Sequence, residues 1–220
     1  MSEPNAVTLR ALVRGYGRRA VLKGLDLEVS AGKVVALFGA NGAGKTTLLR
    51  LLATRLRPSG GTAAVFGRDV VSEGHEVRRR IATLAVFGGA YGTLSAREHL
   101  RLDAAMRELP LADADTLLAR VGLESAADTL VRTYSSGMRK RLGLARLIAA
   151  KADLWLLDEP HAALDQEGQD LLDELVREAN SRGATVLMAT HERERSAALA
   201  DARLVLEDGR LRHLDARRAA

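Results

Sequence analysis

The chain has 220 residues, a formal net charge of +5 at pH 7 and no cysteine. This length suits one domain, or one domain with two lobes, and the missing thiols exclude disulfides, thiolate catalysis and cysteine-based metal sites. The charge would suit a nucleotide, an anionic membrane or a nucleic acid, yet surface arginines explain it equally well. No apolar run of about 18 residues occurs and residues 1–5 do not resemble a secretory signal, so we expect no membrane-spanning segment.

Two β-strands are predicted near the N-terminus, at residues 7–12 and 25–29, because their apolar side chains alternate with polar ones. Tyr16 lies in the turn between them. This tyrosine either packs against its neighbours or stacks on the adenine ring of a nucleotide held by the next loop. Its position alone leaves both interpretations open.

The next segment has the pattern of a phosphate-binding loop, between an apolar run at residues 34–38 and leucines at helical spacing at residues 48–52. In this context G-x-x-x-x-G-K-[ST] indicates a phosphate site rather than a plain glycine turn. Glycines let backbone N–H groups converge on phosphates, and a helix start adds unpaired N–H donors. We expect Lys45 to reach the β- and γ-phosphates of a nucleoside triphosphate and the Thr46 hydroxyl to ligate Mg²⁺. The predicted nucleotide-binding residues of the loop are Gly39, Ala40, Asn41, Gly42, Ala43, Gly44, Lys45, Thr46 and Thr47.

Beyond this loop, strand patterns give way to helices. Glycines and a proline at residues 57–61 stop the first helix, and a glycine-rich joint at residues 88–92 ends the following strands. Ser95 and Glu98 then fit a capping box at the start of a helix. The predicted strands are residues 62–66 and 81–87, and the predicted helices are residues 95–107, 112–121 and 137–150.

Strand patterns return after these helices. Residues 154–157 and 185–189 are apolar runs, an amphipathic helix is predicted between them at residues 166–182, and residues 204–213 predict a closing hairpin. This succession predicts an α/β fold, a P-loop NTPase core in which a mixed sheet with helices is joined by antiparallel N-terminal strands. We assign the chain to one domain, with the core at residues 1–87 and 151–220 and an inserted helical lobe at residues 88–150.

Two carboxylates and a histidine follow the late strands. Asp158 and Glu159 come directly after residues 154–157, and His191 follows the next strand. Because ligands bind at the carboxyl edge of such sheets, we expect Asp158 to hold Mg²⁺ with Thr46 and Glu159 to polarise the attacking water as general base. His191 is placed to contact the γ-phosphate. An acidic turn and a structural histidine are the alternatives, and the preceding P-loop favours the catalytic interpretation.

The segment Tyr-Ser-Ser-Gly-Met at residues 134–138 precedes a predicted helix. Small residues and a glycine at a helix N-terminus can form a second anion site. An ordinary serine N-cap explains the same residues equally well. Local chemistry therefore leaves this segment undecided.

Taken together, these motifs resemble the nucleotide-binding subunit of ATP-binding cassette (ABC) transporters over essentially the whole chain. The resemblance rests on residues 39–47, 134–138, Leu-Leu-Asp-Glu-Pro at 156–160, Ala-Leu-Asp at 163–165 and Thr-His at 190–191. Their order and gaps are more specific than any single motif.

The resemblance implies an ATPase in which two ATP molecules are sandwiched in a head-to-tail homodimer, so that neither subunit has a complete site alone. A signature motif of one subunit would close on the γ-phosphate bound by the other, and hydrolysis would reopen the dimer. In this assignment the signature residues are Ser135, Ser136, Gly137 and Met138, the adenine-stacking residue is Tyr16, the dimer-interface residue is Asp165 and the switch histidine is His191.

The chain departs from the family pattern at two places. The family usually has a glutamine that touches Mg²⁺ at the end of the strand entering the helical lobe, where this chain has Val86 and Phe87. An apolar side chain cannot ligate the metal, so water or backbone must substitute or coupling is altered. Ala162 stands where the family commonly has serine. Both departures bear on turnover of the isolated subunit rather than on ATP binding.

Within the family, the compact cassette and its signature resemble exporters. Residues 154–160 and 163–165 resemble the ATPase of haem exporters used in cytochrome c biogenesis. The alternative is another small exporter, for drugs, polysaccharide or an antibiotic. In either case we expect the chain on the cytoplasmic face of the membrane beside permease subunits that recognise the cargo, with no direct contact to cargo or nucleic acid.

Two other classes of function are weighed against transport. A soluble ABC ATPase acting on ribosomes, DNA or an assembly scaffold would predict two cassettes, a coiled-coil insertion or a long basic arm, and this sequence has none of them. A P-loop kinase for a small molecule would need neither the signature nor the switch histidine.

Overall fold

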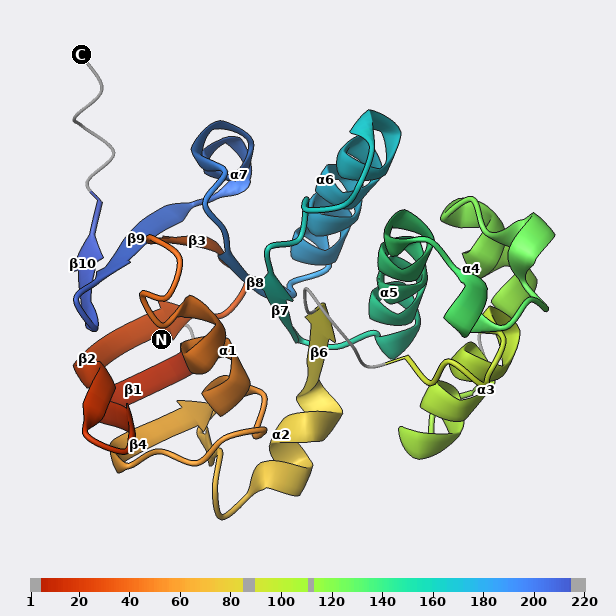
Figure 1. Ribbon diagram of the computed structural model, residues 1–220. Coiled ribbons are helices and arrows are strands. Elements are labelled where there is room, and N and C mark those ends of the chain that lie inside the picture. Colours follow the sequence, from red (N-terminus) through yellow and green to blue (C-terminus); the bar gives the residue numbers. More distant parts are fainter. Residues whose placement is uncertain (1–4, 85–89, 111–112, 215–220) are drawn as a thin grey trace.

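A sheet of buried parallel strands forms the centre of the molecule (Figure 1). The computed structural model describes residues 5–84, 90–110 and 113–214. Every residue of β3, β7 and β8 is buried, as expected for parallel strands covered on both faces. The sheet has the order β10-β9-β3-β8-β7-β6, and its last hairpin is antiparallel. Its strands are β3 (Val34–Phe38), β6 (Ile81–Leu84), β7 (Leu154–Asp158), β8 (Thr185–Ala189), β9 (Ala202–Glu207) and β10 (Arg210–His213).

A second sheet, of order β2-β1-β4-β5, is built from the N-terminal strands. β1 lies between β2 and β4 and pairs with both in antiparallel fashion. The sequence therefore predicted the mixed central sheet and the antiparallel N-terminal strands correctly. The strands of this second sheet are β1 (Asn5–Tyr16), β2 (Arg19–Ser30), β4 (Gly60–Val65) and β5 (Arg68–Asp69).

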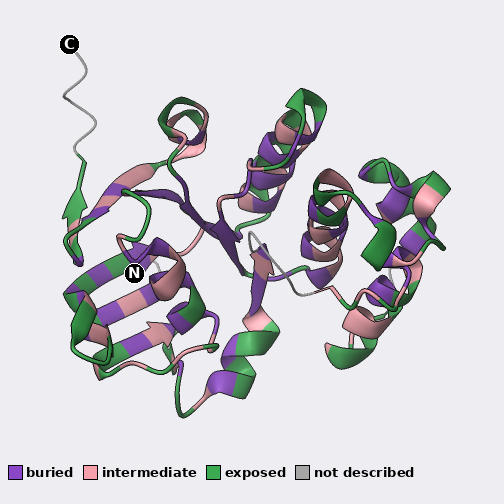
Figure 2. Ribbon diagram, in the orientation of Figure 1, coloured by how far each residue is buried: buried purple, intermediate pink, exposed green. Residues whose placement is uncertain are grey.

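The pleat of the central strands divides the core into two apolar clusters. Figure 2 shows these strands buried along their length. In β7, Trp155 and Leu157 belong to the cluster with α5 and α6, whereas Leu154 and Leu156 face α1 and the antiparallel sheet. Successive side chains of a strand point to opposite faces, so one short apolar run serves both clusters. The helices of the core are α1 (Lys45–Leu52), α2 (Gly74–Arg80), α6 (Gln166–Ser181) and α7 (Arg193–Leu199).

Three helices pack on one another beside the central sheet (Figure 1). The predicted capping box of the first one is present, because the Glu98 N–H donates to Ser95 Oγ at 3.2 Å and the Ser95 N–H donates to Glu98 Oε2 at 2.8 Å. None of the described helices is both long and apolar enough to cross a membrane. The three helices are α3 (Ala96–Met106), α4 (Ala114–Arg120) and α5 (Ser136–Ala150).

The structure differs from the sequence-based expectations in a few elements. The sequence did not predict α7, in which Ser196 is the one buried residue, because a helix without an apolar stripe gives no helical period. Two 3₁₀ turns, Glu124–Ala126 and Val131–Thr133, were also missed. The strand predicted at residues 81–87 is described only as β6, and Val86 and Phe87 lie outside the described residues.

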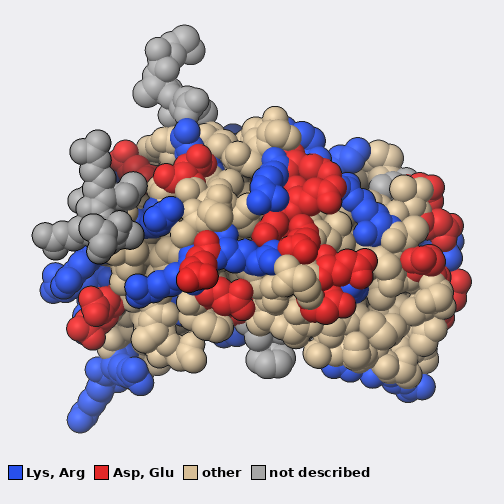
Figure 3. Space-filling model, turned by 90° about the horizontal axis from the view of Figure 1, so that it is seen from above, with Lys and Arg blue, Asp and Glu red and all other residues tan. Residues whose placement is uncertain are grey.

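Charges of both signs share the face that is seen from above in Figure 3. Asp and Glu side chains gather in the middle of that face, with Lys and Arg beside them. In the part of this face that the structure describes, acidic groups therefore interrupt the basic ones.

Candidate nucleotide-binding and catalytic site

The loops after three neighbouring strands meet at one edge of the central sheet. β3 pairs with β8 and β8 pairs with β7, all parallel, so their carboxyl ends lie side by side. These ends carry the glycine-rich loop, the Asp158-Glu159 pair and His191. Ligands bind at this edge in open α/β sheets.

Backbone geometry explains why the loop after β3 needs glycine. Gly39 has a φ of 155°, and a Cβ there would lie 2.5 Å from the Leu206 carbonyl oxygen. Gly44 has a φ of 111°, and a Cβ there would lie 2.9 Å from Leu22 Cδ2. Gly44 is also the N-cap of α1, and no side chain caps that helix. The first N–H groups of α1 are therefore open to an anion.

Lys45 is buried at the inner side of this loop, with only 6% of its surface exposed. Its Nζ donates to the Gly39 carbonyl oxygen at 2.6 Å and lies 3.6 Å from Glu159 Oε1. A buried ammonium needs such partners, because its desolvation is costly. The contacts hold the positive charge at the point where phosphates would enter.

Thr46 and Asp158 form a pair of oxygen donors beneath the loop. The Thr46 hydroxyl donates to Asp158 Oδ1 at 3.1 Å. Burial raises the pKa of the Asp158 carboxyl, because a carboxylate removed from water loses hydration. Mg²⁺ takes oxygen ligands, often one or two carboxylates together with waters and substrate phosphates. These two residues fit that donor set, and a bound cation would offset the cost of burying the carboxylate.

Glu159 is held in a strained backbone conformation between two elements. Its φ is 45°, in the left-handed region that disfavours non-glycine residues. Its N–H donates to the Ala189 carbonyl oxygen of β8 at 2.8 Å. The carboxylate accepts from His191 Nδ1 at 2.9 Å. The two predicted catalytic side chains are thus in direct contact.

Lys140 on α5 was missed by the sequence analysis. It is buried, and its Nζ donates to the Glu159 carbonyl oxygen at 2.8 Å. Burial lowers the pKa of the Lys140 ammonium to about 8, despite the nearby carboxylates. The one sequence signal was its spacing, because Lys140 shares a helix face with the buried Leu144 and Leu147.

The Ser-Ser-Gly-Met segment starts α5 but does not line the loop's cavity. Ser135 is the N-cap, and its Oγ accepts from the Met138 N–H at 3.2 Å. Ser136 and Gly137 follow in the exposed first turn, where a Cβ on Gly137 would lie 3.3 Å from the Ala163 carbonyl oxygen. Within one chain, the described structure therefore brings this segment to the loop after β7 and not to Lys45.

Asp165 lies in the same region as the Ser-Ser-Gly-Met segment. It caps α6 by accepting from the Gly168 N–H at 3.0 Å, and it accepts from Arg141 Nη2 of α5 at 2.9 Å. The hydrogen bonds and the arginine lower the pKa of its carboxyl. Asp165 and the start of α5 thus form one surface.

An open cavity of about 430 Å³ runs along the glycine-rich loop. Its lining extends from Tyr16, Arg19 and Val21 of the first hairpin to Glu159. Tyr16 is 46% exposed, and the Arg14 guanidinium lies 4.7 Å from its ring centroid. The ring is placed where an adenine could stack, and Arg14 already packs on it. The remaining lining residues are Ala40, Asn41, Gly42, Gly44, Lys45, Thr46 and Thr47.

A second cavity, of about 630 Å³, lies among α1, α2, β6 and α3. Met106 at its edge is 73% exposed. Arg78 donates to the Thr54 hydroxyl and Arg55 to the Thr83 hydroxyl, so both guanidinium groups are held by neutral partners. The arginines that line this cavity are Arg55, Arg78, Arg79 and Arg107.

These features define a P-loop nucleoside triphosphatase. They are the glycine loop that leads into α1, the pair of Thr46 and Asp158, and Glu159 directly after Asp158 at the end of β7. The family model described as ABC transporter matches residues 22–162. The chain belongs to the ABC transporter family, whose ATP-binding domains are ATPases.

The similar proteins include drug resistance, cytochrome c biogenesis and Nod factor export proteins. The daunorubicin/doxorubicin resistance ATP-binding protein DrrA of Streptomyces peucetius is 40% identical over 210 residues, which are 94% of this chain and 64% of that protein. The cytochrome c biogenesis ATP-binding export protein CcmA of Bradyrhizobium diazoefficiens is 41% identical over 186 residues, which are 83% of this chain and 90% of that protein. A solved structure of an ATP binding subunit of an ABC transporter has a TM-score of 0.87 at 27% identity and covers 96% of this chain and 90% of that one.

We expect Asp158→Asn to raise the melting temperature of the nucleotide-free protein at pH 7. A carboxyl whose pKa is raised on folding loses stability as pH rises from its unfolded pKa through its folded pKa, and that loss is complete above both. The amide carries no charge and still accepts from Thr46. The variant should also lose the stabilisation by ATP that depends on Mg²⁺. Thermal unfolding with and without ATP and Mg²⁺ measures both effects. A lower melting temperature without nucleotide would contradict this account.

We expect Lys140→Met to lower the rate of ATP hydrolysis roughly tenfold, about the worth of one hydrogen bond to a charged group, and to leave ATP affinity unchanged. Because burial lowers the pKa of Lys140 to about 8, its charged ammonium lowers the stability of the folded state below about pH 8. This penalty disappears as the pH rises from about 8 towards the pKa of the unfolded state. Methionine should therefore not lower the melting temperature at pH 7. Steady-state phosphate release measures the rate, and the exposed Lys33→Met is the control. Equal loss in both variants would refute a role for Lys140.

Proposed function

We propose that this chain is the ATP-hydrolysing subunit of an ABC exporter, with ATP as substrate and Mg²⁺ as cofactor. The observation that carries the proposal is the convergence of three contacts on one cavity. Lys45 lies 3.6 Å from Glu159, Thr46 bonds Asp158 at 3.1 Å, and His191 bonds Glu159 at 2.9 Å. A lysine, a metal-holding pair and a base beside a phosphate loop are the groups that phosphoryl transfer to water requires.

In this proposal the residues divide the chemistry among them. The open N–H groups of α1 and Lys45 bind the β- and γ-phosphates, and Thr46 and Asp158 hold Mg²⁺. The ion supplies positive charge that neutralises the phosphate oxygens. Glu159 accepts the proton of the attacking water, and His191 orients that carboxylate and contacts the γ-phosphate.

We further propose that hydrolysis occurs in a head-to-tail homodimer. The Ser135 cap and the exposed turn after it lie away from the loop cavity of their own chain and beside Asp165. This segment presents the N-terminus of α5 on one surface, and the loop cavity is open on another. A head-to-tail arrangement of two chains would bring the N-terminus of α5 in one chain to the loop cavity of the other. The signature would then close on the γ-phosphate bound by the partner, and Asp165 would lie at the interface. The signature residues are Ser135, Ser136, Gly137 and Met138.

The transport assignment takes its support from the named relatives. One is an export protein for cytochrome c biogenesis at 41% identity, and another is a drug resistance protein at 40%. We propose haem export for cytochrome c biogenesis as the finer function, with export of a drug, polysaccharide or antibiotic as the alternative. Permease subunits in the membrane would bind the cargo, and this chain would lie on the cytoplasmic face.

We propose that the permease contacts this chain at the second cavity, through a segment that carries carboxylates. Arg55 and Arg78 are exposed there and pair with hydroxyl groups rather than with acids, so their charge is available to a partner. Met106 adds an exposed apolar contact. Charge complementarity of this kind fixes the register of an interface and speeds its formation.

Glu159→Gln is expected to lower ATP hydrolysis by roughly 10²- to 10⁴-fold, the usual contribution of a general base, while ATP still binds. The closed homodimer should then persist with ATP and Mg²⁺. Phosphate release and light scattering after size exclusion measure the two effects, with the exposed Glu207→Gln as a charge-matched control. A Glu159→Gln protein that hydrolyses ATP at the wild-type rate would remove Glu159 from catalysis.

The trapped Glu159→Gln protein also identifies the partner. Affinity capture from native membranes with ATP and Mg²⁺ should recover a membrane protein with several spans. The identity of that protein separates haem export from drug or polysaccharide export. Recovery of only ribosomal, nucleic-acid or scaffold components would overturn the transport function and leave the ATPase intact.

Reversing charge in the second cavity tests the permease contact. The double variant Arg55→Glu and Arg78→Glu should recover less permease in the same capture, because carboxylates on both sides repel. Its ATP affinity should not change, since the cavity is separate from the loop. Arg210→Glu, an exposed change of the same charge on β10, is the control. Equal permease recovery from all variants would place the contact elsewhere.

A further inference from the structure

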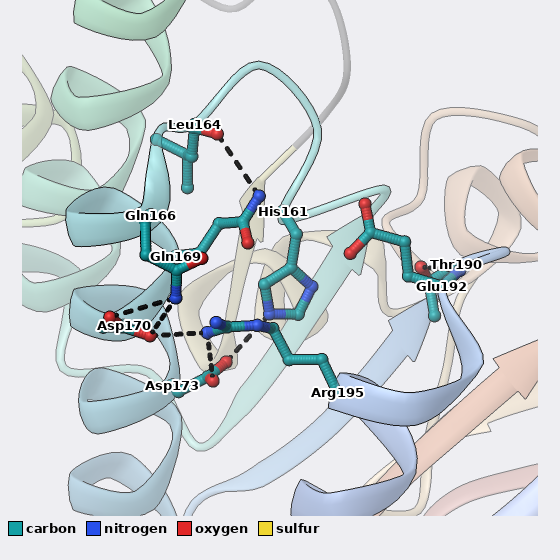
Figure 4. Close-up of polar contacts among 9 residues, drawn as sticks. All are labelled: His161, Leu164, Gln166, Gln169, Asp170, Asp173, Thr190, Glu192 and Arg195. Carbon is teal, nitrogen blue, oxygen red and sulfur yellow. Dashed lines mark hydrogen bonds and ion pairs between the residues drawn. The ribbon is translucent and has the colours of Figure 1, made fainter.

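A buried polar cluster beside the catalytic pair joins three segments of the chain (Figure 4). His161 is 1% exposed, and its Nε2 donates to Asp173 Oδ1 at 2.8 Å. Arg195 Nη1 donates to the other oxygen of the same carboxylate, Asp173 Oδ2, at 2.7 Å. Asp173 therefore lies between a histidine from the loop after β7 and an arginine from α7, and it is itself on α6.

Arg195 also bonds a second carboxylate of α6. Arg195 Nη1 donates to Asp170 Oδ1 at 2.9 Å, and Gln166 Nε2 donates to the same oxygen at 3.0 Å (Figure 4). Asp170 and Asp173 are three residues apart and share one face of the helix. The guanidinium is thus held by two carboxylates, of which only Asp173 also reaches the loop after β7.

These contacts form a second link between the segment that carries Glu159 and the segment that carries His191. Glu159 and His161 are two residues apart on the first segment, and His191 and Arg195 are four residues apart on the second. The direct attachments are three bonds: His191 Nδ1 to Glu159 Oε2 at 2.9 Å, the His191 N–H to the same oxygen at 3.3 Å, and the Glu159 N–H to the Ala189 carbonyl oxygen at 2.8 Å. The indirect one runs from His161 through Asp173 to Arg195. The indirect link adds a constraint farther along both segments, at His161 and Arg195, beyond the reach of the direct bonds.

The helix after His191 has few buried side chains. In α7, which spans seven residues, Ser196 is the one that is buried, and Leu199 is half-buried against the apolar cluster of α5 and α6. So few buried side chains contribute little of the apolar burial that normally fixes a helix to its domain. The polar link through Arg195 therefore adds to the packing of Leu199 and to the bond from Arg203 Nη2 to the Ala197 carbonyl oxygen at 3.1 Å.

We propose that Asp173 is a positioning residue for hydrolysis, which holds His191 against Glu159 by binding His161 and Arg195 at the same time. The inference rests on the proposed function of Glu159 as the base. Asp173 is not among the described residues that line the loop cavity, and its hydrogen bonds go to His161 and Arg195, so its loss should misplace the catalytic pair and leave ATP binding intact. The two bonds go to different oxygens, and asparagine would replace one of these oxygens with an NH₂ donor, so it cannot accept both in this geometry.

The test compares Asp173→Asn with wild type in two backgrounds. With His191 present, we expect kcat to fall roughly ten- to a hundredfold, the usual cost of a small misplacement, with KM for ATP unchanged. With His191→Ala, the same substitution should change kcat less than about twofold, because the residue it acts through is gone. A merely structural role would give the same loss in both backgrounds and would overturn the proposal.

Two further variants keep the test decisive. Arg195→Gln breaks the link at a partly exposed position, so it should reproduce the kcat loss even if Asp173→Asn does not fold. Glu178→Gln is the matched control on the same helix, because it loses an ion pair with Arg120 of α4 and has no connection to α7. A kcat loss in Glu178→Gln equal to that of Arg195→Gln would also overturn the proposal.

Amide hydrogen exchange separates this inference from the proposed function, because it needs no activity. In Arg195→Gln and Asp173→Asn, amides of residues 190–199 should exchange faster than in wild type, and those of α1 should not. If wild type does not hydrolyse ATP, the proposed function fails while faster exchange still supports the link. If wild type hydrolyses ATP and neither exchange nor kcat changes in the variants, the link fails and the function stands.

Discussion

The peptide unit of Glu159 is the constraint on which the site depends. Its left-handed φ costs about 1–2 kcal/mol for a residue with a Cβ, so neighbours must hold it. The N–H donates to Ala189 of β8, and the carbonyl oxygen accepts from Lys140 of α5 and, at 3.3 Å, from the Ala162 N–H. The strand β8 before His191, the helix α5 and the loop before Asp165 therefore all bond to this one residue, which helps to fix their relative placement.

Elements whose signals lie within a few neighbouring residues could be predicted from the sequence. The apolar runs of β3, β7 and β8, the glycine loop at residues 39–47 and the capping box at Ser95 each depend on residues close together in the chain. The carboxylates Asp158 and Glu159 follow from the same logic, because a strand end fixes where the next side chains lie. Local chemistry was enough for these features.

The sequence did not predict the contacts between charged residues that lie far apart along the chain. Lys140 lies 19 positions from Glu159, and Asp173 lies 22 positions from Arg195. A lysine or aspartate on a helix usually faces water, so only the folded chain reveals that these two are buried and paired. α7 was missed for a related reason, since a helix with a single buried residue and no apolar stripe has no hydrophobic period.

In the proposed dimer, α5 would connect the nucleotide of one subunit to the base of the other. Ser135 caps the helix at the end that would meet the partner's γ-phosphate. Lys140, on the second turn of the same helix, donates a hydrogen bond to the Glu159 carbonyl oxygen of its own chain. About 7.5 Å of helix separates these points, five residues at the ordinary rise of about 1.5 Å each, so a displacement at one end is passed on nearly rigidly. Binding at one site would then adjust the strained peptide at the other, which is a physical route by which two ATP sites act together.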